Sequence, residues 1–419
     1  MRLRIPLSVC FGILLCVDWG WAQDVPPPDV LKAIVPQLRK KLPGTEVSFQ
    51  APIVDTTSNS SCGMQQAQMI VSQGTDHHTF DVLIDPPASL PIAPKQVLAR
   101  ITRLRVDADG SARSYHPEDP DGEGVCKEVS QASGTTTLQG ICALDDISNA
   151  GIRLFVGSER IMKSDPKKNP ETGDSDLAKE WRSVWPLIRD KTLKPIDLKM
   201  IAGPSAPDGY YLFYWRPREL TVFFNTNNIP TTREGYPCLH GSESRFPGYF
   251  VTSTTLNQRG SIGADGCAPT RYIDSEQIPF FVLPGNSFGR VEIGDIVVGY
   301  IKIGSRERVV YGVAGDTGPF DQFGEGSIAF NKQLLDDPKV VMNAKSVDAL
   351  DIDLDAFDKG RSGTLAILIL GGTKQLLDGN YSLQNIETVG RSQFASWGGK
   401  GELAFHRLSA CVAAAPINP

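Results

Sequence analysis

The stretch VVYGVAGDTGPFDQFGEGSIAF, residues Val309 to Phe330, sets two acids at the boundaries of two apolar runs. The first run is rich in valine and leads into a glycine-rich turn that carries Asp316. Glu325 follows nine positions later, between two glycines. Glycine leaves a neighbouring carboxylate uncovered, and turns at the ends of regular elements are where folds expose polar side chains. The pattern therefore predicts that Asp316 and Glu325 open on one cleft.

The composition indicates a β-rich fold beyond this stretch as well. Glycine and proline number 40 and 30, and short apolar runs separated by turn residues follow one another after Gly209. Such spacing is typical of short strands. We expect a mainly β fold with added helices (α+β). Its core would be a twisted, barrel-like sheet of six strands, with the double-psi arrangement as one form of it.

Residues 1–22 have the features of a secretory signal peptide. Arg2 and Arg4 precede an apolar stretch too short to span a membrane, and Gly20-Trp21-Ala22 supplies the small residues of a cleavage site. We expect cleavage after Ala22, and a secreted or periplasmic monomer without a membrane span.

We divide the rest of the chain into three parts. Residues 23–95 form an N-terminal accessory region of unknown role, which ends in the proline-rich segment DPPASLPIAP. Residues 96–411 form the principal domain, and residues 412–419 are a C-terminal tail.

Removal of the signal leaves an even number of cysteines, which suits disulfide bonds in an exported protein. They are Cys62, Cys126, Cys142, Cys238, Cys267 and Cys411. About fifteen pairings are possible for six cysteines, and the spacing does not choose among them. Since no two cysteines or histidines have metal-ligand spacing, we expect no metal.

The charge balance is slightly acidic, with 42 Lys and Arg against 48 Asp and Glu and a net charge of -6. General nucleic-acid binding needs a basic face, so the balance argues against it. It favours a neutral or cationic ligand.

Several local elements can be predicted. A helix from Val30 to Leu42 contains Pro36 as a kink, and a second helix from Leu177 to Arg189 sets Trp181 and Trp185 on one face. These tryptophans suit core packing better than stacking on sugar rings.

A strand is expected from Val97 to Val106, where apolar and polar residues roughly alternate. The DADG that follows it is similar to part of a calcium loop. It lacks the remaining ligand positions, so an Asp-Gly turn is the simpler interpretation.

Asp316 and Glu325 admit three interpretations. In the first they belong to an ordinary turn, in which Asp316 bonds its own backbone and Glu325 caps the next element. In the second, Asp316-Thr317-Gly318 is the D-T-G of an aspartic protease, and Ala366 to Gly372 is similar to the apolar segment that supports its catalytic acid. Such proteases need a second like carboxylate, and the chain has no second D-T-G or D-S-G.

The third interpretation is glycoside hydrolysis. One protonated carboxyl would donate to the leaving oxygen, and one ionised carboxylate would activate water or attack carbon. In an inverting enzyme the two stand roughly 6.5 to 9.5 Å apart. The turn between Asp316 and Glu325 permits that separation.

Ordered blocks of this region resemble the chitosanases of glycoside hydrolase family 75. In chain order they are GYFVTSTTL (Gly248 to Leu256), RYIDSEQIPFFVLPG (Arg271 to Gly285), IGDIVVGY (Ile293 to Tyr300), VVYGVAGDTGP and GEGSIAF. Upstream, DADGSARSYHPEDP and CALDDISNAGI are similar to the opening stretch of bacterial members. The resemblance covers roughly Val97 to Cys411, and the long insertions at Gly157 to Ala206 and Leu335 to Leu365 depart from it.

The resemblance implies a secreted, endo-acting, inverting hydrolase of β-1,4-linked glucosamine polymers (chitosan). Asp316 and Glu325 match the family's catalytic pair, and no metal or organic cofactor is implied. We expect Glu325, beside Phe323 and an apolar run, to be the general acid, and Asp316, among backbone N–H groups, to be the general base. The alternative from another class is a non-catalytic polysaccharide-binding protein on the same fold.

Other polar residues are candidates for binding substrate. Asp274 and Thr254 would line the groove, where Asp274 would pair with glucosamine ammonium groups or, equally, cap the turn before the next strand. Asp107, Asp109 and His116 would form a polar wall of the same cleft, for which a structural role is the simpler interpretation.

Overall fold

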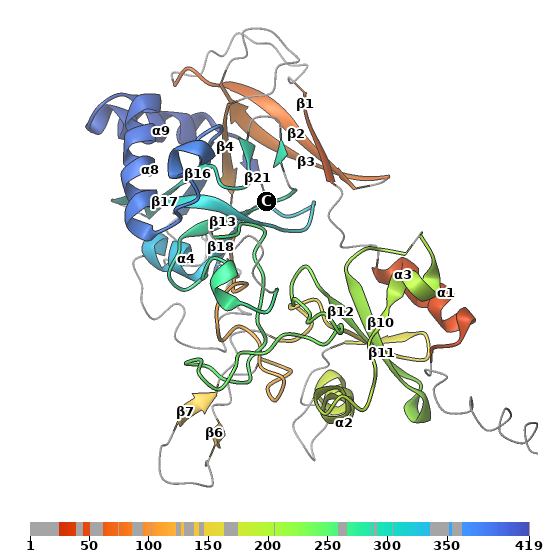
Figure 1. Ribbon diagram of the computed structural model, residues 1–419. Coiled ribbons are helices and arrows are strands. Elements are labelled where there is room, and N and C mark those ends of the chain that lie inside the picture. Colours follow the sequence, from red (N-terminus) through yellow and green to blue (C-terminus); the bar gives the residue numbers. More distant parts are fainter. Residues whose placement is uncertain are drawn as a thin grey trace, which may run out of the picture.

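In the computed structural model the described residues are 25–38, 45–50, 62–73, 75–85, 95–101, 103–122, 127–129, 138–141, 146–162, 175–204, 206–258, 266–285, 287–288, 291–303, 305–335, 352–353 and 363–418. The expected signal, residues 1–22, lies outside them, as do Cys126 and Cys142. A large mixed sheet and a smaller antiparallel sheet dominate this part of the chain, and helices flank both (Figure 1).

The large sheet has the strand order β1-β2-β3-β4-β20-β16-β17-β13-β18-β5-β19, with β21 beside β4. The bounds are β1 Thr45–Gln50, β2 Gln65–Gln73, β3 Asp76–Ile84, β4 Gln96–Ile101, β5 Arg103–Asp107, β13 Phe280–Leu283, β16 Ile296–Ile303, β17 Arg306–Thr317, β18 Glu325–Ser327, β19 Ile352–Asp353, β20 Gly363–Leu370 and β21 Ile417–Asn418. Three neighbouring pairs are parallel: β13 with β17, β18 with β5, and β21 with β4. The expected mainly β fold with added helices is therefore confirmed at that level.

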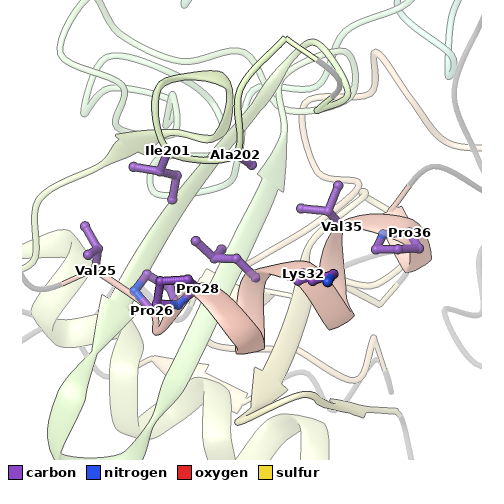
Figure 2. Close-up of a pocket in the computed structure, with 9 residues that line it drawn as sticks. Val25, Pro26, Pro28, Lys32, Val35, Pro36, Ile201 and Ala202 are labelled. Carbon is purple, nitrogen blue, oxygen red and sulfur yellow. The ribbon is translucent and has the colours of Figure 1, made fainter.

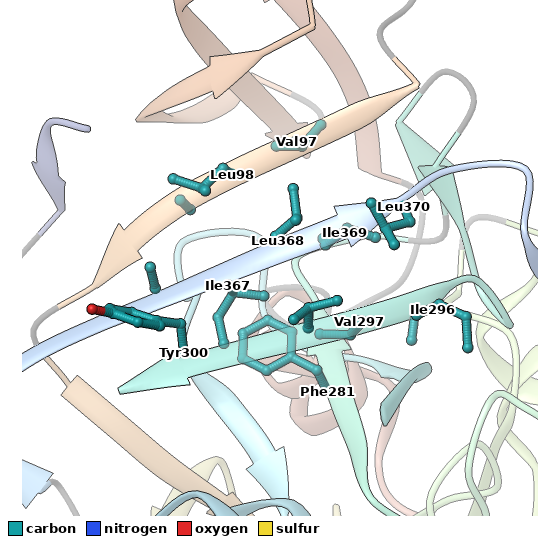
Figure 3. Close-up of a cluster of buried hydrophobic side chains, with 14 of the residues drawn as sticks. Val97, Leu98, Phe281, Ile296, Val297, Tyr300, Ile367, Leu368, Ile369 and Leu370 are labelled. Carbon is teal, nitrogen blue, oxygen red and sulfur yellow. The ribbon is translucent and has the colours of Figure 1, made fainter. Parts of the chain in front are cut away.

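The centre of the large sheet is buried on both faces. Every residue of β20 from Leu365 to Leu370 is buried, and Val97 and Leu98 of β4, Val297 and Tyr300 of β16 and Phe281 of β13 belong to the same core (Figure 3). Continuous apolar runs are what such strands require, since neither face meets water. On one side α8 (Leu383–Gly398) lies against β16 and β17, and α9 (Glu402–Ala414) packs on α8, with Phe405 against Tyr300 of β16 (Figure 1).

The expected strand from Val97 to Val106 is two strands, which separate at residue 102. β4 pairs with β3 and β20, whereas β5 pairs with β18 and β19. The strand order of the described residues runs from β1 to β19 and shows no closed barrel. This change of partners carries the end of β5, and Asp107 with it, to the side of β18.

Strands of the expected accessory region extend the large sheet. β2 and β3 pair along their length, and β3 pairs with β4 where Leu83 lies opposite Leu98. A disulfide joins Cys62 to Cys411 of α9, with Cα atoms 5.0 Å apart. The expected tail, 412–419, includes the end of α9 and β21, whose Asn418 bonds the backbone of Asp81. The boundary at residue 95 stays a prediction.

The smaller sheet has the order β10-β11-β12-β8-β9. Its strands are β8 Arg153–Val156, β9 Glu159–Ile161, β10 Ile196–Asp197, β11 Tyr210–Trp215 and β12 Leu220–Asn225. Helix α2 (Asp176–Arg189) begins at Ser175, whose side chain accepts from the Ala178 amide. Trp181 and Trp185 of α2 stack 5.2 Å apart in the buried core, so the core-packing interpretation of these residues is confirmed.

Helix α1 (Pro28–Leu38) covers part of the smaller sheet together with α3 (Leu198–Ala202). It begins two residues earlier than Val30, as expected it contains Pro36, and residues 39–44 after it lie outside the described part. An apolar pocket of about 500 Å³ lies between α1 and Ile201 of α3, with Lys32 as the charged residue in its lining (Figure 2). No group of acids lines it, so it is not the expected site.

The remaining elements are short. They are α4 Ile328–Leu335, α7 Lys374–Leu377, the 3₁₀ helices η3 Arg216–Arg218 and η4 Pro269–Arg271, the hairpin of β6 Lys127–Val129 with β7 Leu138–Ile141, and the pair β14 Ser287–Phe288 with β15 Val291–Glu292. A second disulfide joins Cys238 to Cys267. Among the described residues no helix combines the length and apolarity needed to cross a membrane.

Candidate active site

Three of the predicted acids lie at the ends of strands that come together in the large sheet. Asp316 is the penultimate residue of β17, Glu325 opens β18, and Asp107 closes β5. β13 runs between β17 and β18, and β18 is parallel to β5, with Ser327 opposite Asp107. Sheet pairing therefore brings together acids from segments that are far apart in the chain.

A β-bulge orients the end of β17. The pairing of β13 with β17 shifts between Phe281 and Val282, so that Asp316 lies opposite Val282 and Gly315 is passed over. A Cβ on Gly315 would lie 2.5 Å from the Cβ of Phe280, so only glycine fits at this position. Bulges re-aim side chains next to functional sites, and this one sets the direction of Asp316.

One oxygen of Asp316 collects three hydrogen bonds. Its Oδ1 accepts from the Thr255 amide at 3.0 Å, from the Thr255 hydroxyl at 2.6 Å and from the Thr317 amide at 2.7 Å. Donors of this kind favour the charged carboxylate. The other oxygen, Oδ2, is left for other partners.

Two further aspartates stand beside Asp316. Asp107 Oδ1 accepts from the Asp109 amide at 2.8 Å, and Asp109 Oδ2 accepts from Nδ2 of Asn228 at 3.1 Å. Asp107, Asp109 and Asp316 are each only 8% exposed. Each offers an oxygen within 4.8 Å of the others, which makes them the one such trio of acid, histidine or cysteine side chains in the part of the chain that is described.

The turn that holds Asp109 depends on Gly110. Its φ is +83°, and a Cβ there would lie 2.0 Å from the carbonyl oxygen of Ile273. The Gly110 amide donates to the Thr252 hydroxyl at 2.8 Å. The DADG motif therefore forms the expected Asp-Gly turn, and close packing of backbones explains its glycine.

Burial dominates the electrostatics of the trio. It raises the pKa of Asp316 to about 6, although the bonds from Thr255 and Thr317 act in the opposite direction. The pKa values of Asp107 and Asp109 lie well above their usual range, first because of burial and then because of the neighbouring carboxylates. Since the three strong donors converge on Asp316, the first negative charge of the trio belongs there.

Three carboxylates at this spacing suit either a hard cation or shared protons. Within the described residues, the groups that act on the trio are acids, amides, hydroxyls and Tyr115, and no lysine, arginine or histidine pairs with it.

Glu325 stands at the edge of the same site and is half-buried. Its Oε2 lies 3.4 Å from the position that a Cβ would take on Gly318, two residues beyond Asp316. Its charge raises the pKa of both Asp107 and Asp109. We expected Glu325 to be the more desolvated acid, but Asp316 is the more deeply buried of the two.

The other predicted residues are held by local contacts. Asp274 accepts from the Glu276 amide and from Gln277, so it caps the turn before β13. The buried Thr254 hydroxyl donates to the Leu256 carbonyl.

His116 is buried edge-on against Tyr249, and its Nδ1 accepts from the Glu118 amide. Burial lowers the pKa of His116. Of the secondary candidates, the structure brings Asp107 and Asp109 to Asp316, and none of the described contacts joins Asp274, Thr254 or His116 to it.

Two residues that hold the acids of the site could not be identified from the sequence. Thr255, next to the predicted Thr254, is the threonine that contacts Asp316, and Asn228 holds Asp109. In an extended segment adjacent side chains point to opposite sides. The block GYFVTSTTL therefore indicated that a threonine lies at the site, but it did not indicate which of the two adjacent threonines faces the acid. Asn228 lies in a turn whose residues bear no pattern.

Comparison with models of protein families finds no match for this chain, and a search of curated proteins finds no similar sequence.

Proposed function

We propose that this protein is a secreted, endo-acting glycoside hydrolase that cleaves β-1,4-linked glucosamine polymers, chitosan above all, by single displacement. The observation that carries the proposal is the contrast between the two acids around β13. Asp316 is buried and receives three hydrogen bonds on one oxygen, whereas Glu325 is half-buried at the same edge. Two carboxyls in different environments are what general acid–base hydrolysis of a glycoside requires.

Four of the sequence blocks that resemble family 75 lie together around these acids. GYFVTSTTL supplies Thr255, RYIDSEQIPFFVLPG forms the turn before β13 and β13 itself, and the two last blocks form the end of β17 and β18. Their convergence supports the resemblance, because these four blocks contribute to one site.

In the proposed mechanism Asp316 is the general base and Glu325 the general acid. Asp316 removes a proton from water, whose oxygen attacks the anomeric carbon, while Glu325 gives its proton to the departing glycosidic oxygen. The donors on Oδ1 support the ionised form of Asp316 and leave Oδ2 to accept the proton. A gap of roughly 6.5 to 9.5 Å between the two carboxyls, wide enough for the water, is part of the proposal.

Substrate charge fits the site. The glucosamine ammonium group is cationic, and Asp107, Asp109 and Asp316 come with no basic partner among the described side chains. An acidic cleft attracts such a polymer before any specific contact forms.

The proposal includes the form of the core. β4 and β5 are separated by one residue and pair with β20 and β18. Counted as one bent strand, they would complete a six-stranded, barrel-like ring with β20, β16, β17, β13 and β18. The strand order is compatible with such a ring, but among the described residues no hydrogen-bonded strand pair closes it.

The test is hydrolysis of soluble chitosan and of glucosamine hexasaccharide, followed by reducing ends and by the anomeric NMR signals of the first products. We expect inverted products from wild type and loss of about 10²- to 10⁴-fold in kcat for Glu325→Gln, the usual contribution of a general acid or base. Asp321→Asn is the matched control, because Asp321 is an exposed acid in the same connection between β17 and β18.

Other outcomes would point elsewhere. No release by wild type from chitosan, chitin, cellulose-type glucans or peptidoglycan would reject the enzyme. If wild type and Glu325→Gln then bind chitosan equally, the protein is a polysaccharide-binding protein. Release of peptides from denatured protein substrates at acid pH, lost in Asp316→Asn, would favour the aspartic protease.

A further inference from the structure

Asp109 is the least satisfied acid of the site. Its Oδ1 is buried and has no hydrogen-bond partner among the described residues, while its Oδ2 accepts one bond from Asn228. A charged oxygen buried in this way is costly, because nothing replaces the water it has lost. A protonated carboxyl has a hydrogen of its own to donate and removes that cost.

The hydrogen-bond donors of the site are unequally shared among the three carboxyl groups. Asp316 accepts hydrogen bonds from two amides and a hydroxyl on one oxygen, Asp107 accepts one from the Asp109 amide, and Asp109 has the side chains of Asn228 and Tyr115 as its hydrogen-bond partners. Carboxylates this close cannot all ionise, and the charge settles where the donors are.

We propose that Asp109 stays protonated and directs its O–H toward Asp316, so that it acts as a positioning residue for the proposed general base. The inference rests on the proposed function for its catalytic consequence, but the protonation of Asp109 can be tested without any substrate. One carboxylate oxygen of Asp109 lies within 4.8 Å of one of Asp316, a separation that one bridging water can span.

The charged and titratable groups that face Asp109 come from every neighbouring strand end. They are Asp107 from β5, Asp316 from β17, Glu325 from β18, and Tyr115 from the loop after the Asp-Gly turn. Burial and the two acids Asp316 and Glu325 raise the pKa of Asp109, whereas Tyr115 and Asn228 lower it. The raised pKa agrees with the hydrogen-bond count.

The consequence for the reaction is that one proton stays in the site throughout. Asp109 keeps its hydrogen while Asp316 takes a proton from water, so the hydrogen bond to Asp316 stabilises the charged base before each turnover. Asparagine reproduces this arrangement, because its Nδ2 group is also a neutral donor. Alanine removes the donor altogether.

Stability against pH is the first test, with urea unfolding of wild type and Asp109→Asn at several pH values. A carboxyl with a raised pKa in the folded state costs stability as pH rises above its unfolded value of about 3.9. We therefore expect the urea midpoint of Asp109→Asn to rise relative to wild type between about pH 4 and pH 7. A relative fall over this range would overturn the proposal, because it would mean that Asp109 is ionised in the folded protein.

Activity is the second test and separates failure of this inference from failure of the proposed function. We expect kcat with glucosamine hexasaccharide to fall at least about tenfold in Asp109→Ala with little change in KM, and Asp109→Asn to recover most of the loss. The ascending limb of the pH profile should move upward in Asp109→Ala and stay in place in Asp109→Asn. Loss of activity in Asp109→Asn equal to that in Asp109→Ala would overturn the proposal.

A bound cation is the competing explanation of the trio, and calorimetry with CaCl₂ and MgCl₂ tests it. We expect no stoichiometric binding that depends on Asp109. One ion per chain, with binding abolished in Asp109→Asn, would overturn the proposal, since an ionised ligand and a protonated donor exclude each other.

Discussion

Asp295 and Asp316 are two buried acids near the ends of neighbouring strands of the same sheet. The Ala314 amide bonds the Asp295 carbonyl, only two residues from Asp316. The carboxylate of Asp295 is enclosed by donors: Oδ2 accepts from the Glu292 amide, and Oδ1 accepts from the amides of Thr373 and Lys374. Asp316 uses only one oxygen and faces two other acids.

Under the proposed function, this difference separates a structural acid, Asp295, from a catalytic one, Asp316. Both are buried, and burial raises the pKa of both. Both carboxylate oxygens of Asp295 accept hydrogen bonds, one from the turn before β16 and the other from the start of α7, so neither is left for a ligand. Asp316 keeps one oxygen uncommitted in a site where other carboxyls gather. Unused hydrogen-bonding capacity, rather than burial, is what distinguishes Asp316 as the candidate for catalysis.

The largest expected effect is on activity. Asp316→Asn should lower kcat by about 10²- to 10⁴-fold, since the amide cannot take a proton from water. Asp295→Asn should leave kcat per folded molecule unchanged. Rates with glucosamine hexasaccharide, normalised to the folded fraction from circular dichroism, check the pair. Equal losses in the two variants would remove the distinction drawn between these acids.

The next effect is on stability, and its sign should differ between the same two variants. Asp316 has a pKa of about 6 when folded, so its carboxyl costs stability as pH rises from about 4 to about 6. Asp316→Asn should therefore gain about 2 to 3 kcal/mol in the free energy of unfolding at pH 7, and the gain should vanish near pH 4.

Asp295→Asn should instead lose about 1 to 3 kcal/mol, because its Nδ2 group would face the Glu292 amide, which needs an acceptor. Urea unfolding at pH 4 and pH 7 measures both changes. A gain of stability in Asp295→Asn at pH 7 would show that its donors matter less than its burial.

The smallest effect concerns the pH profile. In wild type kcat/KM should rise through about pH 6 as Asp316 ionises. Thr255→Val removes one of the three donors to Asp316 and should move this limb upward by less than about one pH unit, with up to about a tenfold loss below it. Thr254→Val is the control, since its hydroxyl bonds the Leu256 carbonyl and should affect stability only. A shift of the limb in Thr254→Val would mean that both threonines act on the base.

Much of the fold could be predicted from local pattern. The helix at Leu177–Arg189 and the strands at Val309 and Ala366 form where their apolar periodicity placed them. The single strand predicted from Val97 to Val106 was wrong, although the sequence carries a sign of the break: its apolar residues change from odd to even positions after Ile101, so the alternation loses phase at residues 102 and 103. The change of partners there depends on which strands come alongside.

The site divides in the same way. Asp316 and Glu325 were visible because glycines surround them, and the Asp-Gly turn at Asp109 has a local signature. The joining of Asp107 and Asp109 to Asp316 depends on the parallel pairing of β18 with β5, across more than 200 residues. Nor could sequence decide between Thr254 and Thr255, since the bulge at Gly315 and the packing of the loop select which threonine meets the acid.

By itself, the sequence determined the β-rich class, the strand ends that bear acids and the glycines that leave these acids uncovered, because each depends on neighbours along the chain. Only the tertiary structure decided which acids share a site, which is most deeply buried and which oxygen remains free. Those properties depend on desolvation and on donors from distant segments, so they do not exist until the strands have paired.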